Sequence, residues 1–148
     1  MDATAECFNG ASPIVNEILM IEPKLKKLVD QSRQDEEVLA VILFGSQARG
    51  EATPASDIDV CLVLAGRDHD PLFLSQKKLD YLTVGGLDLH LYQQLPIYIR
   101  RRVLKEGRVL FVRNEDALYE IAFRSAQAFE DFRHYYEDYL NKVAHAGP

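Results

Sequence analysis

The sequence has 148 residues, of which 47% are hydrophobic and 27% are charged, and its formal net charge is −6. This composition is typical of a globular protein that buries a core without disulfides or a structural metal. The negative charge argues against direct nucleic-acid binding over a broad surface, because such binding depends on Lys and Arg. We expect a single domain over residues 1–148.

The N-terminal residues and the cysteines bear on the cellular compartment. Residues 1–11 are predicted to form a loose leader. The N-terminus lacks the positive segment and apolar run of a secretory signal, so we do not expect one. No apolar run in the sequence reaches the roughly 18 residues that a membrane span needs. Cys7 and Cys61 are the only cysteines and indicate no disulfide framework. The sequence therefore predicts a cytoplasmic protein without a membrane partner.

The first part of the chain is predicted to contain helices and then a buried strand. Ser12-Pro13 indicates the start of a helix through Leu19, and Pro23 either breaks this helix or begins another. Residues 38–44 are nearly all apolar and partly β-branched, which favours a central strand. The apolar residues at helical spacing after Pro23 are Leu25, Leu28 and Val29.

A second predicted strand, from Asp57 to Leu64, alternates between two kinds of side chain. Asp57, Asp59 and Cys61 share one face, which we interpret as the site face, and the apolar residues between them face the core. Two carboxylates at i and i+2 on a strand lie roughly 6–7 Å apart along the backbone, and such a pair can share divalent metal ions. Residues 47–55 are expected to form a short helical turn and a loop.

The later elements alternate between helix and strand. We predict helices over 72–82 and 95–105, strands over 87–92 and 109–112, and a last helix over 114–143. The strand 87–92 places Asp88, His90 and Tyr92 on one face and three leucines on the other. The run Arg100-Arg101-Arg102 is interpreted as a solvated helix face, and Gly107 closes that helix.

The last predicted helix carries an aromatic stripe. The positions of this stripe follow heptad-like spacing. They are Leu118, Ala122, Ser125, Phe129, Phe132, Tyr136, Tyr139 and Val143. Such a stripe either packs on the core or overhangs the domain and forms a homo- or hetero-oligomeric interface, and both alternatives stay open.

Three groups of residues fit metal-dependent transfer of a nucleotidyl or phosphoryl group. Gly45 and Ser46 follow a strand, and such a turn can hold phosphate with its N–H groups and hydroxyl. Asp57 and Asp59 can bridge two divalent ions, and Mg²⁺ prefers oxygen ligands. Asp88 is the best candidate for a third carboxylate that draws the proton from the acceptor hydroxyl, provided that its strand neighbours the first pair.

The same residues carry a family resemblance. Gly45-Ser46, ten intervening residues and Asp57-Ile58-Asp59 resemble the signature of the DNA polymerase β-like nucleotidyltransferase superfamily. The Gly-Ser-x-Ala-Arg-Gly and Ser-Asp-Ile-Asp-Val runs are similar to those of its minimal nucleotidyltransferase (MNT) branch. The resemblance covers roughly residues 38–112 and includes Asp88 as the third acid.

The resemblance implies an α/β fold in which a small mixed sheet is flanked by helices, with a long C-terminal helix added here. It implies Gly45 and Ser46 as the triphosphate-contacting turn, and Asp57, Asp59 and Asp88 as metal ligands, with Asp88 also the catalytic base. The expected cofactor is Mg²⁺, as two ions, and the expected substrate is ATP. Stand-alone MNT proteins are commonly antitoxins that transfer AMP onto a tyrosine of a HEPN ribonuclease toxin, and we expect this function.

Several alternatives remain open at this point. Arg49 either reaches a phosphate or forms a salt bridge, Ser56 either caps the turn or orients Asp57, and His90 either touches substrate or is a satisfied histidine on the sheet. Gly45, Ser46, Arg49 and Ser56 are the candidate nucleotide-binding residues. Two further functions also fit: AMP transfer to a small molecule such as an aminoglycoside, and a non-catalytic antitoxin that blocks its partner sterically.

Overall fold

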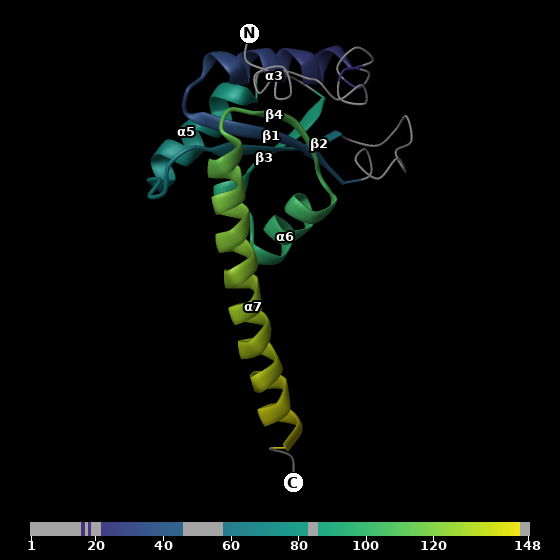
Figure 1. The fold of residues 1–148 in the computed structure, drawn as a ribbon, viewed down its shortest axis with the longest axis vertical. Helices are drawn as coiled ribbons and strands as arrows, with labels where there is room; N and C mark the ends of the chain where they lie inside the picture. The colour runs from purple at the N-terminus through teal and green to yellow at the C-terminus, as the bar shows by residue number, and fades with distance from the viewer. Residues whose placement is uncertain (1–15, 17, 19–21, 46–57, 83–85, 146–148) are drawn as a thin grey trace.

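The structure is a computed structural model, which describes residues 16, 18, 22–45, 58–82 and 86–145. Within these residues, four strands form one sheet with helices against both of its faces (Figure 1). The elements are α3 (Pro23–Gln34), β1 (Val38–Phe44), β2 (Ile58–Leu64), α5 (Pro71–Tyr81), β3 (Leu87–Leu91), the 3₁₀ turn η1 (Tyr92–Gln94), α6 (Ile97–Glu106), β4 (Arg108–Val112) and α7 (Glu115–His145).

The sheet is mixed, with the strand order β3-β2-β1-β4. β1 pairs antiparallel with β2 and β4, whereas β2 pairs parallel with β3. A parallel pair needs a crossover connection, and α5 lies in that connection. β1 is buried from Val38 to Leu43, as its apolar sequence predicts for a central strand. The strands and helices predicted from residue 38 onward that fall within the described residues are confirmed, with ends that differ by a few residues.

One face of the sheet is covered by α3 and α5. Leu25, Leu28 and Val29 of α3 lie on one side of the helix and are at most 2% exposed. Leu74 and Tyr81 of α5 belong to the same apolar cluster. The predicted stripe after Pro23 is therefore the core-facing side of α3. The leader 1–11 and most of the helix predicted from Ser12 to Leu19 lie outside the described residues.

The other face is covered by α6 and the first half of α7. Its apolar cluster contains Ile42, Cys61, Val63 and Val103. Cys61 is fully buried, and this burial raises the pKa of its thiol. Cys61 lies on the face of β2 that carries Asp59, as predicted, because the residue between them belongs to the opposite cluster. The interpretation of this face as the site face is wrong at Cys61, because helices cover both faces of this sheet and bury it there.

The arginine run in α6 also departs from its predicted role. Arg101 and Arg102 are exposed, but Arg100 is half-buried and donates hydrogen bonds to the carbonyls of Tyr92, Gln93 and Leu95. Its guanidinium also lies 5.2 Å from the centre of the Tyr92 ring. Arg100 therefore fixes η1 against α6 and does not belong to a solvated face.

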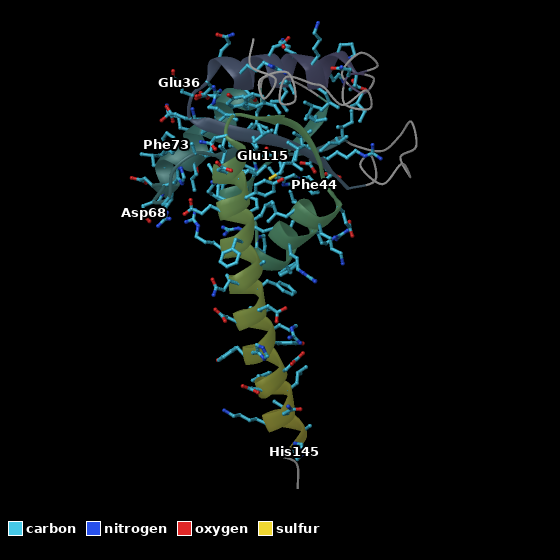
Figure 2. The ribbon with its side chains drawn as sticks, viewed as in Figure 1. Glu36, Phe44, Asp68, Phe73, Glu115 and His145 are labelled. Carbon is cyan, nitrogen blue, oxygen red and sulfur yellow. The ribbon has the colours of Figure 1, made fainter. Side chains whose placement is uncertain are left out.

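Helix α7 continues far beyond the sheet. It begins after Asn114, whose side-chain oxygen accepts a hydrogen bond from the Ala117 N–H. Its 31 residues correspond to a length of about 46 Å. Figures 1 and 2 show its second half projecting away from the sheet, with His145 near the free end. Within the described ranges, no helix combines the length and apolarity required to cross a bilayer.

The aromatic stripe of α7 divides into two parts. Leu118 packs against the second core cluster, and the Ser125 hydroxyl is hydrogen-bonded to that of buried Tyr92. Further along, four stripe members are between 45% and 57% exposed: Phe132, Tyr136, Tyr139 and Val143. The first half of the stripe therefore packs on the domain, whereas the second half overhangs it.

Two polar clusters hold α3 in place. Asp35, which follows α3, accepts hydrogen bonds from Lys77 and Tyr81 of α5. Burial alone would raise the pKa of Asp35, but the hydrogen bonds of Lys77, Tyr81 and the Glu37 N–H outweigh it and lower the pKa. Burial and the hydrogen bond to Asp35 both raise the pKa of Tyr81.

Arg113, which directly follows β4, forms the second cluster. Its guanidinium donates hydrogen bonds to the carbonyls of Ser32, Arg33, Asp35 and Val38. These carbonyls lie at the end of α3 and at the start of β1, where the helix can no longer supply partners. Arg113 therefore ties the end of β4 to the connection between α3 and β1.

Candidate active site

Two acids come together because β2 and β3 are parallel neighbours. The pairing places Asp59 directly beside Asp88, and each is the second residue of its strand. Neighbouring strands lie about 4.8 Å apart, so side chains on the same face of such a pair meet. The predicted convergence of these two acids is confirmed for the described residues.

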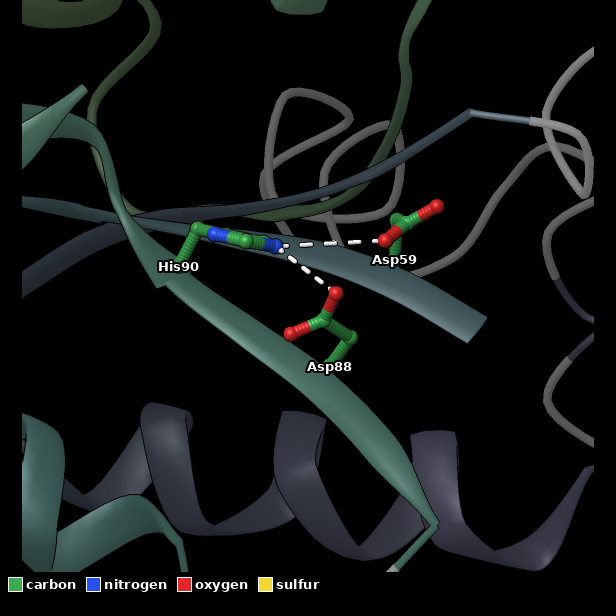
Figure 3. Close-up of side chains that lie close together, drawn as sticks. All are labelled: Asp59, Asp88 and His90. Carbon is green, nitrogen blue, oxygen red and sulfur yellow. Dashed lines mark ion pairs between the residues drawn. The ribbon is translucent and has the colours of Figure 1, made fainter. Parts of the chain in front are cut away.

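His90 completes a cluster with these two acids (Figure 3). Its Nε2 lies 3.1 Å from Asp88 Oδ2 and 3.8 Å from Asp59 Oδ1. The side chains of Asp59, Asp88 and His90 are 29%, 52% and 30% exposed, so the cluster is open to solvent on one side. Partial exposure of this kind admits a ligand from solvent.

The end of β1 forms one wall of the cluster. Phe44 pairs with Asp59 in the antiparallel register, and its ring meets the His90 ring edge-on at 5.6 Å. Gly45 follows with a φ of +75°, and a Cβ added there would lie 2.5 Å from Asp59 Oδ2. Glycine is therefore required at position 45 both by the backbone conformation and by the closeness of the carboxylate.

The donor atoms fit a divalent cation. One ligand atom from each of Asp59, Asp88 and His90 can be chosen so that all three lie within 4.8 Å of one another. Carboxylate oxygens suit Mg²⁺, and imidazole nitrogen is a common ligand of transition metals. The cluster thus has the composition and spacing of a metal site.

The other predicted site residues lie outside the described residues. They are Ser46, Arg49, Ser56 and Asp57, all in the segment 46–57. In sequence this segment connects Gly45 to Ile58, and both of these residues lie next to the acid cluster. The contact of Phe44 with His90 was not anticipated, since nothing in a run of apolar strand residues marks one of them as part of a site.

A cavity of about 380 Å³ lies away from the cluster of Asp59, Asp88 and His90. It is lined in part by Arg67, Tyr92, Arg100, Arg124 and Ser125, from the loop after β2, η1, α6 and α7. Asp59 and Asp88 are near the starts of β2 and β3, whereas this cavity adjoins the other end of β2. The acid cluster and the cavity are therefore separate features of the molecule.

Known proteins resemble this chain in sequence. Residues 25–116 match the family model described as "Polymerase beta, Nucleotidyltransferase". A stretch of 74 residues is 35% identical to "Putative protein adenylyltransferase MJ1547" of Methanocaldococcus jannaschii. That stretch is 50% of this chain and 56% of the relative, so the match spans about half the length of the curated protein.

Solved structures resemble the fold as a whole. A chain from the crystal structure of a toxin–antitoxin with AMP-PNP aligns with a TM-score of 0.60 and 19% identity, over 82% of this chain and 97% of that one. A chain from a tri-AMPylated Shewanella oneidensis HEPN toxin in complex with MNT antitoxin aligns with a TM-score of 0.55 and 17% identity, over 82% and 94%.

These findings agree with the topology and with the acid cluster. The structural likeness confirms the expected α/β fold, in which a small mixed sheet is flanked by helices. The family model matches more than half of the sequence, including β1, β2 and β3 and therefore Gly45, Asp59 and Asp88. The chain belongs to the polymerase beta nucleotidyltransferase family.

Proposed function

We propose that this chain transfers AMP from ATP to a tyrosine hydroxyl of a HEPN toxin in the cytoplasm and thereby acts as its antitoxin, with residues 1–148 as one domain. The observation that carries the proposal is the pairing of Asp59 with Asp88 beside Gly45. The relative from M. jannaschii, named as a protein adenylyltransferase, and the toxin–antitoxin complexes of similar fold support the same acceptor class.

Each site residue has a proposed role in this reaction. Asp57, Asp59 and Asp88 would hold two Mg²⁺ ions, which supply charge neutralisation at the triphosphate. Asp88 would accept the proton of the tyrosine hydroxyl, which then attacks the α-phosphorus as pyrophosphate leaves. Gly45 and Ser46 would hold the triphosphate with backbone N–H groups and hydroxyl, with Arg49 and Ser56 beside it.

We propose that the toxin contacts the second half of α7. This half exposes an aromatic stripe, listed above from Phe132 to Val143, that nothing in the described structure covers. Exposed aromatic surface is characteristic of protein interfaces. The complexes of similar fold support a HEPN protein as the proposed occupant. Replacing Phe132 and Tyr136 with Asp is expected to weaken toxin binding in a pull-down without lowering the melting temperature, and unchanged binding would exclude this contact.

The experiment that tests the reaction uses the purified chain, ATP labelled at the α-phosphate, Mg²⁺ and a purified HEPN toxin. Asp59→Asn and Asp88→Asn are each expected to reduce labelling of the toxin by about 10²–10³-fold or more. Asp68→Asn is the matched control, because Asp68 is exposed beyond the opposite end of β2. Circular dichroism checks that all three variants fold.

The outcomes separate the alternatives. Label on the toxin that disappears in both site variants supports the proposal. Neutralisation of the toxin that survives both substitutions identifies a steric antitoxin instead. Label that appears on an aminoglycoside but not on the toxin identifies a small-molecule transferase.

A further inference from the structure

We propose that His90 is a direct nitrogen ligand of a divalent cation held by Asp59 and Asp88, and that it gives this site a preference for Mn²⁺ over Mg²⁺. The inference rests on the proposed function, because it specifies the metal of that same site. It concerns an imidazole that the proposed metal site of three carboxylates leaves without a role.

One of the two carboxylate distances around His90 Nε2 equals the distance between adjacent ligands of one ion. In an octahedral site with metal–ligand bonds of about 2.1–2.2 Å, adjacent donor atoms lie about 3.0–3.1 Å apart and opposite ones about 4.2–4.4 Å. Nε2 lies 3.1 Å from Asp88 Oδ2, which is the adjacent-ligand distance. It lies 3.8 Å from Asp59 Oδ1, which is about 0.7 Å (3.8 − 3.1) longer than the adjacent-ligand distance and shorter than the opposite one. The same nitrogen therefore faces two carboxylates from different strands, one of them at the adjacent-ligand distance.

The fold holds the imidazole in this orientation. His90 pairs with Cys61 in the parallel register. This pair lies two residues further along β2 and β3 than the pair Asp59 and Asp88. Cys61 is fully buried, and the Phe44 ring packs edge-on against the imidazole. A ring placed between a buried strand and an aromatic wall loses little further freedom when it binds an ion, which favours coordination.

The type of donor atom determines which divalent ion binds more tightly. Mg²⁺ is a hard cation that keeps several waters and is bound mainly by oxygen. Imidazole suits first-row transition metals, so replacing one water by Nε2 favours Mn²⁺ over Mg²⁺ relative to a carboxylate-only site. A site in which a third carboxylate replaced His90 would have a weaker preference for Mn²⁺.

Pulsed electron paramagnetic resonance of Mn²⁺, added alone below one equivalent, tests the ligand directly. We expect ¹⁴N modulation typical of a coordinated imidazole in the wild type. The modulation should be lost in His90→Gln and kept in His134→Gln, a matched control on the exposed part of α7. Wild-type protein labelled with ¹⁵N-histidine should show the corresponding ¹⁵N coupling, a result that needs no variant to fold.

Metal titrations give a second readout. His90→Gln is expected to weaken Mn²⁺ binding roughly tenfold or more and to weaken Mg²⁺ binding much less. Equal weakening of both ions, or no weakening, would overturn the preference.

The results also separate this inference from the proposed function. Suppose that Mn²⁺ binds the wild type without nitrogen coupling and does not bind Asp59→Asn. This result would overturn the role of His90 and leave the carboxylate site standing. Failure of Mn²⁺ to bind the wild type would overturn both the inference and the metal site.

Discussion

Replacing Gly45 with Ala tests whether the end of β1 fixes the position of the Asp59 carboxylate. The φ of +75° costs an alanine about 1–2 kcal/mol, and the stiffer unfolded chain returns about 0.4–1 kcal/mol. The net loss in free energy of unfolding is therefore about 1 kcal/mol, which lowers the melting temperature by about 3–5 °C. The fold should survive this change.

The effect on activity should be much larger than the effect on stability. The new Cβ would lie 2.5 Å from Asp59 Oδ2, and ordinary contact begins at 3.4 Å, so the carboxylate must move by about 0.9 Å (3.4 − 2.5). A misplacement of about 1 Å in a catalytic arrangement costs about 100-fold in rate. We expect AMP transfer to the toxin to fall by that factor in a steady-state labelling assay.

Gly66→Ala is the matched control for this experiment. Gly66 has a φ of +88°, but the nearest atom to its added Cβ is His69 Nε2 at 3.8 Å, an ordinary contact. It should lose similar stability and keep its activity. The reasoning is refuted if the two variants transfer AMP at similar rates at a temperature where both are folded.

Three further predictions concern groups outside the site. Arg113→Met removes the guanidinium that binds the end of α3 and is expected to cost about 1.5–3 kcal/mol, so an unchanged urea midpoint would contradict it. Because the pKa of Asp35 is lowered on folding, its ionised form stabilises the protein above the unfolded pKa of about 3.9, and this contribution is lost as pH falls through the folded pKa. Wild type should therefore exceed Asp35→Asn in thermal stability at pH 7 and lose that advantage in acid; a constant difference would disprove this. In a Cys7→Ser background, buried Cys61 should react with a thiol reagent only upon unfolding, and fast labelling of the native protein would count against its burial.

Much of the fold could be predicted because most elements have a clear local pattern. Residues 38–44 are apolar and partly β-branched, which favoured a buried strand, and the alternation after Leu87 identified Asp88 before its neighbours were known. The meeting of Asp59 with Asp88 could not be derived from periodicity, since it depends on which strands pair and in which register. That part of the site came from the family resemblance and is confirmed by the parallel pairing.

The errors have physical causes that a sequence pattern does not contain. Cys61 was assigned to the site face together with Asp59, but α6 and α7 bury that face beyond Asp59. Arg100 was assigned to solvent, but η1 presents three carbonyls to its guanidinium. The elements that bury these residues are the helices α6 and α7 in one case and the 3₁₀ turn η1 in the other. Side-chain spacing along a single strand or helix does not reveal such contacts.

The position of β3 in the sheet has a consequence for how activity responds to denaturant. In the part of the chain that the structure describes, β3 pairs with β2 alone, at the end of the strand order, yet it contributes Asp88 and His90. Edge elements open locally at lower free energy than the core strands do. Mild urea should therefore inactivate the enzyme before β1 loses protection from hydrogen exchange, so that catalysis reports on the opening of a single strand.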